Sequence, residues 1–413
     1  MSDQLDVLLH DRLVATITNV PGDLNIVAID PDYRDDVAAP TLSLNAFRDP
    51  VTRRYRETIR PTRGRVHPYF SNLLPEGPLR TYLARHAHVK PVREFPLLWV
   101  LGVDLPGALV MRHHDGGPAP PPDDHEQNDR GDRDEELLRF SLAGVQLKFS
   151  ATGSPQRGLT FPAEGRGGSW IVKLPDQRFA NVPENEYSMM TFARAVGIDV
   201  PEIALVDPAE VGGLPGDVRN LTGRAYAIRR FDRGNAGARI HTEDFAQANV
   251  LYPEQKYRAF NFDRLAREVA DWIGSDAALE IVRRIVFGVG IGNGDMHAKN
   301  WSMIYPDQHT PAVAPAYDYL STVIYMPDDD LGLNFAGTKA FTDVSAELVS
   351  AFADRASLPR RPVLRAAAEM VDRMRDIWPG LRGELPMEER QLAAIEAHME
   401  RVPLFVGRGV LTG

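Results

Sequence analysis

The run GNGDMHAKN, from Gly292 to Asn300, places an acid, an imidazole, an ammonium group and an amide close together. An Asp followed five positions later by an Asn is the spacing of a kinase catalytic loop. In such a loop the carboxylate takes a proton from the substrate hydroxyl and the amide holds magnesium. The Gly-Asp-x-His part of the run also resembles one loop of the two-metal phosphoesterases. These two interpretations require different partner residues elsewhere in the chain.

The phosphoesterase interpretation requires further metal ligands, notably an early Asp-x-His and late histidines. Only His309 and His398 follow His297, and neither belongs to a His-x-His pair. No Asp-x-His precedes the loop in a strand-like context. The sequence therefore disfavours a two-metal phosphoesterase.

The kinase interpretation requires a second acidic magnesium ligand, a lysine that reaches the nucleotide phosphates from a strand, and a glutamate that holds this lysine. APAYDYLST supplies Asp318 after the strand-like WSMIY, and SWIVKLP supplies Lys173 between apolar neighbours. Glu186, in ENEYSMM, lies on the next expected helix. These residues occur along the chain in the order that a two-lobed kinase requires, and chance would rarely produce that order. The order is Lys173, Glu186, Asp295, Asn300 and Asp318.

The glycine-rich phosphate loop of a kinase has no counterpart here, because no G-x-G-x-x-G run precedes Lys173. The nearest candidate is FSLAGVQLKFS, Phe140 to Ser150, which contains a single glycine. Its backbone N–H groups could still bind phosphates, helped by Lys148. Spacing alone gives this assignment little support.

The expected secondary structure could position these residues. The loop follows SDAALEIVRRIVFGVGIG, a predicted helix with Ser275 and Asp276 as cap candidates and apolar residues at helical spacing. GLTF, GGSWIVKLP and GRAYAIRRFDR are expected to be strands, and NEYSMMTFARAVG a helix. Further upstream, LDVLLHDRLVATITNV and LNIVAID alternate as strands do, and NLLPEGPLRTYLARHA is expected to be helical.

These elements predict an α+β protein with a two-lobed, protein-kinase-like fold. Residues 1–112 form a β-rich N-terminal module, and residues 113–136, rich in Pro, Gly and acids, form a flexible linker. Residues 137–235 are expected to be the strand-rich lobe with the phosphate loop and the ATP lysine. Residues 236–413 are expected to be the helical catalytic lobe.

The composition is that of a soluble globular protein, with 43% hydrophobic and 25% charged residues. No apolar run is long enough for a transmembrane helix, and MSDQLDVLLHDRL carries acids where an export signal would carry lysines. The absence of cysteine excludes disulfides and thiolate metal sites, which fits a cytoplasmic protein.

Nucleic-acid binding by the whole surface is disfavoured by the net charge of −10. The segment from Arg53 to Arg65 is a local exception with six arginines. It is either a solvated basic face or a contact to phosphates in a larger DNA complex, and the sequence leaves both open.

Taken together, these stretches closely resemble the HipA family, the serine/threonine kinase toxins of bacterial toxin–antitoxin pairs. The resemblance extends over nearly the whole chain, because HPYFSNLLPEG is similar to the N-terminal module of the family. Its most specific part is the Asn-x-Asp-x-His-x-Lys-Asn pattern at 293–300. The other similar stretches are SLAGVQLK, WIVKLP, NEY, RRFDR, HTEDFAQ and YDYLS.

The resemblance implies a role for each matching residue. Asp295 would be the catalytic base, Asn300 and Asp318 would coordinate Mg²⁺, and Glu186 would orient Lys173. Ser141 matches the serine that the family autophosphorylates, which ejects the phosphate loop and silences the enzyme. The implied ATP-binding residues are Ala143, Gly144, Val145, Gln146, Leu147, Lys148, Lys173, Arg229, Arg230, Phe231, His297, Ala298, Lys299, Asn300, Tyr317 and Asp318.

The resemblance also implies a HipB-like helix-turn-helix antitoxin as partner, contact with DNA only through that antitoxin, and a protein substrate such as an aminoacyl-tRNA synthetase. Two other functions compete with the kinase toxin. A catalytically idle co-repressor would not need Asp295, Asn300, Asp318 and Lys173. A small-molecule phosphotransferase would share the Asp-to-Asn loop, but it would not explain Ser141 or the N-terminal module.

Overall fold

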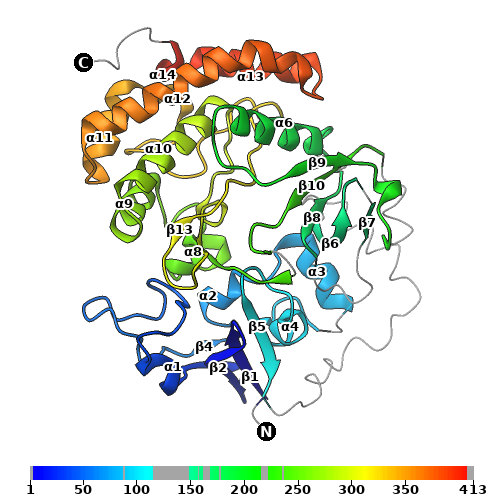
Figure 1. The fold of residues 1–413 in the computed structure, drawn as a ribbon, viewed down its shortest axis with the longest axis vertical. Coiled ribbons are helices and arrows are strands. Elements are labelled where there is room, and N and C mark those ends of the chain that lie inside the picture. The colour runs from blue at the N-terminus through cyan, green and yellow to red at the C-terminus, as the bar shows by residue number, and fades with distance from the viewer. Residues whose placement is uncertain are drawn as a thin grey trace.

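The computed structural model describes residues 3–86, 89–114, 148–156, 158–160, 168–175, 178–214, 222–234 and 237–406. The N-terminal module, in blue and cyan, lies at one end of the molecule in Figure 1. The last helices, in orange and red, lie at the opposite end, and a second sheet lies between them on one side.

The N-terminal module is built on an antiparallel sheet with strand order β4-β3-β2-β1-β5. Buried side chains alternate with exposed ones along β3, so one face of this strand packs on a core that includes Leu5, Val7 and Ile17. The strands are β1 (Asp3–Leu9), β2 (Arg12–Val20), β3 (Leu24–Ile29), β4 (Thr62–Arg63) and β5 (Leu109–His113). The helices are α1 (Pro31–Asp35), α2 (Pro68–Ser71), α3 (Gly77–His86) and α4 (Glu94–Leu101).

The strand-rich lobe contains a second sheet, with strand order β7-β6-β8-β10-β9. Its helix α6 (Val182–Ala195) buries Met189, Met190 and Phe192 against the core of the helical lobe. The strands are β6 (Lys148–Ser154), β7 (Gly158–Thr160), β8 (Trp170–Lys173), β9 (Ile203–Val206) and β10 (Ala225–Arg229), and a 3₁₀ turn η1 (Pro208–Glu210) follows β9.

The C-terminal lobe, which was expected to be the catalytic one, is mostly helical, as predicted, but it also contains a small antiparallel sheet, β11-β12-β13. Its strands are β11 (His241–Asp244), β12 (Ser302–Tyr305) and β13 (Ala312–Val313). Its helices are α8 (Phe245–Ala248), α9 (Phe262–Trp272), α10 (Ser275–Gly290), α11 (Ala346–Arg355), α12 (Arg360–Leu381), α13 (Glu389–Arg401) and α14 (Pro403–Val406). Its 3₁₀ turns are η3 (Pro253–Gln255), η4 (Ala298–Asn300), η5 (Phe341–Asp343) and η6 (Arg382–Glu384).

Helix α10 leads into the loop at residues 292–300, which is called the acidic loop below. The helix contacts α9, α12 and α13. Its buried residues include Ile281, Ile285 and Phe287, so the predicted apolar pattern does face the core. The predicted cap is wrong, because the N-cap is Gly274, with φ of 135°, and it makes no side-chain hydrogen bond. A side chain is disfavoured at that φ, so a glycine ends the preceding turn.

Within the described ranges, no helix combines the length and apolar character that a membrane span needs. Of the predicted linker, only His113 and His114 belong to the described residues. The predicted module boundary at residue 112 falls inside β5.

Candidate active site

The loop after α10 is held by its own side chains. The side-chain oxygen of Asn293, which is fully buried, accepts a hydrogen bond from the backbone N–H of Asp295 at 3.0 Å. The amide nitrogen of Asn300 donates to the backbone oxygen of Asp295 at 2.8 Å. The five-residue spacing of Asp295 and Asn300 is therefore fixed by a direct hydrogen bond. Because the nitrogen of Asn300 is used in this way, its side-chain oxygen is the atom that can face a cation.

The carboxylate of Asp295 accepts a hydrogen bond from the hydroxyl of Tyr257. Burial raises the pKa of Asp295 above its ordinary value, while the Tyr257 hydroxyl and the ammonium group of Lys256 oppose this increase. The negative charges of Asp318 and Asp329 act in the same direction as burial. A half-buried carboxylate with a raised pKa, already bonded to a hydroxyl, is suited to act as a general base.

Lys173 forms ion pairs with one carboxylate of each lobe, Glu186 in the strand-rich lobe and Asp318 in the helical lobe. Its ammonium group lies 2.5 Å from Glu186 Oε1 and also forms an ion pair with Asp318. Burial lowers the pKa of Lys173, but the two carboxylates outweigh burial and raise it above its ordinary value. Lys173 therefore stays charged at physiological pH, as a phosphate-binding lysine must. In the second sheet it pairs with Lys148 on β6 and with Tyr226 on β10.

Asp318 has an unusual backbone conformation, with φ of +58° in the left-handed region. Non-glycine residues adopt this region at a cost in free energy, and such residues often lie at functional sites. The amide of Asn293 donates to the backbone oxygen of Asp318 at 3.5 Å, which connects the Asp318 turn to the acidic loop.

A magnesium ion would fit Asn300 and Asp318, because an amide oxygen and a carboxylate are ligands that this ion accepts. In the part of the chain that the structure describes, no cluster of three or more His or acidic residues could hold a metal. Magnesium in nucleotide sites is usually held by one or two protein carboxylates together with substrate phosphates, so two protein ligands are sufficient.

The segment 229–231, which contains three predicted ATP-binding residues at the end of β10 and is called the hinge below, is connected to the acidic loop by aromatic rings. The ring of Phe231 lies 5.7 Å from that of Tyr317 between centroids. The Tyr317 hydroxyl donates to the backbone oxygen of Lys299 at 2.8 Å and lies 2.6 Å from the hydroxyl of Ser302. Arg229, at the end of β10, is exposed and lies 3.8 Å from Glu202.

His297 is a neutral, buried imidazole. Its ring packs edge-on against Tyr257, with centroids 5.0 Å apart. Burial, helped by the charge of Lys256, lowers the pKa of His297 to about 3. Ala298 follows it, and its N–H donates to the backbone oxygen of Lys256 at 3.2 Å.

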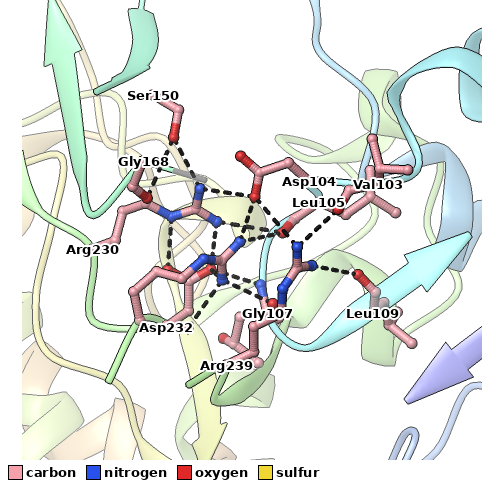
Figure 2. A network of polar contacts seen from close by, with 12 residues as sticks. Val103, Asp104, Leu105, Gly107, Leu109, Ser150, Gly168, Arg230, Asp232 and Arg239 are labelled. Carbon is pink, nitrogen blue, oxygen red and sulfur yellow. Dashed lines mark hydrogen bonds and ion pairs between the residues drawn. The ribbon is translucent and has the colours of Figure 1, made fainter. Parts of the chain in front are cut away.

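The Arg230 side chain, a predicted ATP-binding group, is buried in a polar cluster between the N-terminal module and the hinge (Figure 2). Its guanidinium group makes two hydrogen bonds to Asp232, at 2.8 and 2.9 Å, and lies 3.6 Å from Asp104. Arg233 bonds to the same two carboxylates, at 2.8 and 2.9 Å. Arg239 donates to two backbone oxygens of the module. In this arrangement the Arg230 guanidinium is directed to the module, so contact with a nucleotide would fall to its backbone.

The structure thus brings most of the predicted residues to one place, at the junction of the two lobes. Ser141 and Ala143 to Leu147 lie outside the described residues, and of Lys148 only the backbone is described. Sequence reasoning did not identify Tyr257 or Glu76, a residue of the N-terminal module that contacts Lys299. For Glu76, its place in the stretch HPYFSNLLPEG was a usable signal. The stretch KYRAF, around Tyr257, contains no such signal.

Comparison with known proteins identifies the family of the chain. A family model described as the HipA-like C-terminal domain matches residues 140–378, and one described as the HipA N-terminal domain matches residues 5–112. The Sinorhizobium fredii protein named "Putative kinase Y4dM" is 47% identical over 404 residues, covering 97% of each chain. The "Serine/threonine-protein kinase toxin HipA" of Shewanella oneidensis is 24% identical over 380 residues, covering 82% of each chain.

Among solved structures, the chain is similar to one in a Shewanella oneidensis complex of HipA, HipB and operator DNA. The TM-score is 0.71 at 20% identity, and the match covers 96% of this chain and 95% of the other. This likeness confirms the predicted α+β, kinase-like fold. Since the C-terminal family model alone matches more than half of the sequence, the chain belongs to the HipA family.

Proposed function

We propose that this chain is a serine/threonine protein kinase that transfers the γ-phosphate of ATP to a protein and acts as the toxin of a toxin–antitoxin pair. The observation that supports this most directly is the arrangement of Lys173, Glu186 and Asp318 beside the loop that carries Asp295. A binding protein without catalysis would gain nothing from placing a charged lysine and a general base around one site.

In the proposed reaction, Asp295 accepts the proton of the substrate hydroxyl as the oxygen attacks the γ-phosphorus. Lys173 binds the nucleotide phosphates, and Glu186 holds its ammonium group in place. When bound at Asn300 and Asp318, Mg²⁺ would neutralise part of the phosphate charge. The buried surroundings of Asp295 limit its contact with water and keep its pKa raised, which favours proton transfer.

The names of the relatives extend the proposal to partners. One relative is named as a serine/threonine kinase toxin, and the similar structure is a complex with HipB and operator DNA. We therefore expect a HipB-like helix-turn-helix antitoxin, contact with DNA only through it, and action in the bacterial cytoplasm. An aminoacyl-tRNA synthetase is the candidate substrate.

Autophosphorylation at Ser141 is proposed as the off switch. A phosphate would add roughly −1.5 to −2 charges to a loop that must receive the triphosphate of ATP, and the repulsion would disfavour nucleotide binding. Arg230 and Arg233, which could otherwise attract such a phosphate, are already bonded to Asp232 and Asp104. Charge repulsion is therefore the expected cause of the silencing.

The proposal is tested with full-length protein, MgATP and a bacterial lysate, with phosphorylated sites read by mass spectrometry. Asp295→Asn is nearly isosteric and removes the base, so transfer to substrates and to Ser141 should fall by about 10²–10⁴. Asp328→Asn, which changes an exposed carboxylate in the same lobe, is the matched control and should retain activity. Turnover by Asp295→Asn close to that of the unmodified protein would refute the assignment.

A further inference from the structure

Glu76 of the N-terminal module reaches into the catalytic lobe and contacts two lysines. Its Oε1 atom lies 2.5 Å from the Nζ atom of Lys299, and its Oε2 atom lies 3.0 Å from that of Lys256. Lys299 also donates to the backbone oxygen of Asn72, in the same module, at 3.2 Å. The carboxylate thus binds one ammonium group with each oxygen.

Both lysines are neighbours of the catalytic groups. Lys299 directly precedes Asn300 in the turn η4. Lys256 directly precedes Tyr257, whose hydroxyl donates to Asp295, and its backbone oxygen accepts the N–H of Ala298. A displacement of the Lys299 backbone would move Asn300 directly, and one of the Lys256 backbone would reach the acidic loop through Tyr257 and through the hydrogen bond to Ala298.

Glu76 is charged and holds two charged partners. Burial raises the pKa of Glu76, but the ammonium groups of Lys299 and Lys256 outweigh burial and lower it to about 2, so Glu76 is ionised throughout the physiological range. The charge of Lys256 also lowers the pKa of Asp295, and that of Lys299 lowers the pKa of Asp244, both against burial. The positions of the two ammonium groups, which Glu76 fixes, therefore help to set the electrostatic potential beside the acidic loop, where the phosphates are expected.

A simpler interpretation is that Glu76 only attaches the module to the lobe. The chain offers a comparison, because Arg65 and Glu254 form another ion pair between the same two parts, with hydrogen bonds of 2.6 and 3.0 Å. The side chains of Glu76 and Glu254 are 34% and 61% exposed, so the Glu76 contacts are half-buried and the Glu254 contacts are largely exposed. Loss of the Glu76 contacts should therefore cost more stability than loss of the Arg65–Glu254 pair, and the informative result is a selective effect of Glu76 on nucleotide binding.

We propose that Glu76 is a positioning residue of the phosphoryl-transfer site. It holds Lys299 and Lys256 where their ammonium groups attract the terminal phosphate of a nucleoside triphosphate, and the N-terminal module thereby becomes part of the active site. This inference deepens the proposed kinase function and rests on it for its effect on turnover, but its effect on nucleotide affinity can be measured without turnover.

The experiment compares Glu76→Gln, Glu76→Asp and the control Glu254→Gln in the full-length protein. Calorimetry gives the affinities for MgADP and for the Mg²⁺ complex of the β,γ-imido analogue of ATP. Glu76→Gln should lower the affinity for the imido analogue about tenfold and leave that for ADP nearly unchanged, because only the analogue carries a terminal phosphate in the γ position. Its kcat/KM should fall by a similar factor or more. Glu76→Asp, which retains the charge, should recover part of both losses.

Melting temperatures show that each variant is folded when its affinities are measured. Glu76→Gln should melt below Glu254→Gln, because its contacts are less exposed, and Glu254→Gln should retain the unmodified ratio of the two affinities. Equal changes in that ratio for the two variants, or no change for Glu76→Gln, would overturn the inference. If the unmodified protein transfers no phosphate to any protein, the proposed kinase function fails, and the affinity ratio still decides the role of Glu76.

Discussion

The hydrogen bond between Tyr257 and Asp295 places a hydroxyl beside the proposed general base, which a substrate hydroxyl would have to approach. This bond lowers the pKa of Asp295, against the effect of burial. Tyr257→Phe would remove the hydroxyl and keep the ring beside His297, so the pKa of Asp295 should rise further. Because the base acts in its deprotonated form, the acidic limb of the profile of kcat/KM against pH should move to higher pH, with activity at high pH little changed.

Tyr252→Phe is the control for this measurement, since the hydroxyl of Tyr252 donates to the backbone oxygen of Val66 at 3.4 Å, away from Asp295. Its pH profile should match that of the unmodified protein. An acidic limb that stays in place in Tyr257→Phe would show that the hydroxyl does not tune the base.

At the scale of single residues, the part of the site that could be predicted from the sequence is the part that depends on short spacings along the chain. Asp295 and Asn300 are five positions apart and bond to each other, so their relation is local. Tyr257 and Glu76 contact the same loop from 38 and 223 positions away in the sequence. No short-range pattern records such contacts, because they arise only when the lobes and the module have packed.

At the scale of elements, the acidic loop is positioned by close backbone packing against Gly332. A Cβ atom added at Gly332 would lie 2.7 Å from the backbone oxygen of Gly294 and 2.9 Å from the backbone nitrogen of Met296. Backbone atoms cannot yield as a flexible side chain can. Gly332→Ala should therefore lower the free energy of unfolding by about 1–3 kcal/mol. It should also displace Asp295, with a loss of turnover on the order of 10²-fold.

The matched control is Gly380→Ala in α12, where an added Cβ meets no atom within 4 Å. Alanine is the better helix former, so this change should be neutral or stabilising by about 0.5–1 kcal/mol, with normal turnover. Urea unfolding and steady-state kinetics on both variants test the difference. Normal turnover and stability in Gly332→Ala would mean that the loop can move away at no cost.

Helix α10 and strand β8 were predictable because each has a strong apolar pattern and is buried as that pattern requires. The cap of α10 was not, because Ser275 and Asp276 carry side chains typical of a cap, yet Gly274 holds that position with a positive φ. The two-residue strand β13 is defined by its partner β12 rather than by its own residues, so the sequence contains no separate signal for it.

At the scale of the whole molecule, the N-terminal module is joined to the catalytic lobe by buried polar groups. Glu243 accepts hydrogen bonds from the hydroxyl of Ser43 at 2.7 Å and the backbone N–H of Leu44 at 3.0 Å. Asp104 forms an ion pair with Arg233, next to the hinge (Figure 2), and Glu76 forms one with Lys299 in the acidic loop. The acidic linker at 113–136 left the relative placement of the module unpredictable from the sequence, because these contacts join residues far apart in the chain.

His241 lies at the junction between the N-terminal module and the lobe, and its titration tests whether this junction excludes water. Its fully buried ring bonds through Nε2 to the backbone oxygen of Leu42 at 2.9 Å and stacks on Tyr305. A carbonyl only accepts, so Nε2 carries the proton and the ring is neutral. Its Nδ1 atom has no hydrogen-bond partner among the described residues. Protonation would bury a charge and an unsatisfied N–H, and burial lowers the pKa of His241 to about 4.

The sign of the pH dependence follows from this lowered pKa. Below about pH 6.5 the unfolded chain takes up a proton at His241 that the folded protein does not take up until about pH 4. The free energy of unfolding should therefore fall, through this group, by about 1.4 kcal/mol for each pH unit lost in that interval. His241→Gln removes this titration and keeps an amide donor for the backbone oxygen of Leu42. As the pH falls from 6.5, the free energy of unfolding of the variant, minus that of the unmodified protein, should therefore increase by about 1.4 kcal/mol for each pH unit.

Urea unfolding from pH 8 to pH 5 measures this difference in unfolding free energy, which should be constant above about pH 7.5. A difference that is also constant between pH 6.5 and pH 5 would mean that His241 can be protonated in the folded protein, and that the junction between module and lobe admits water.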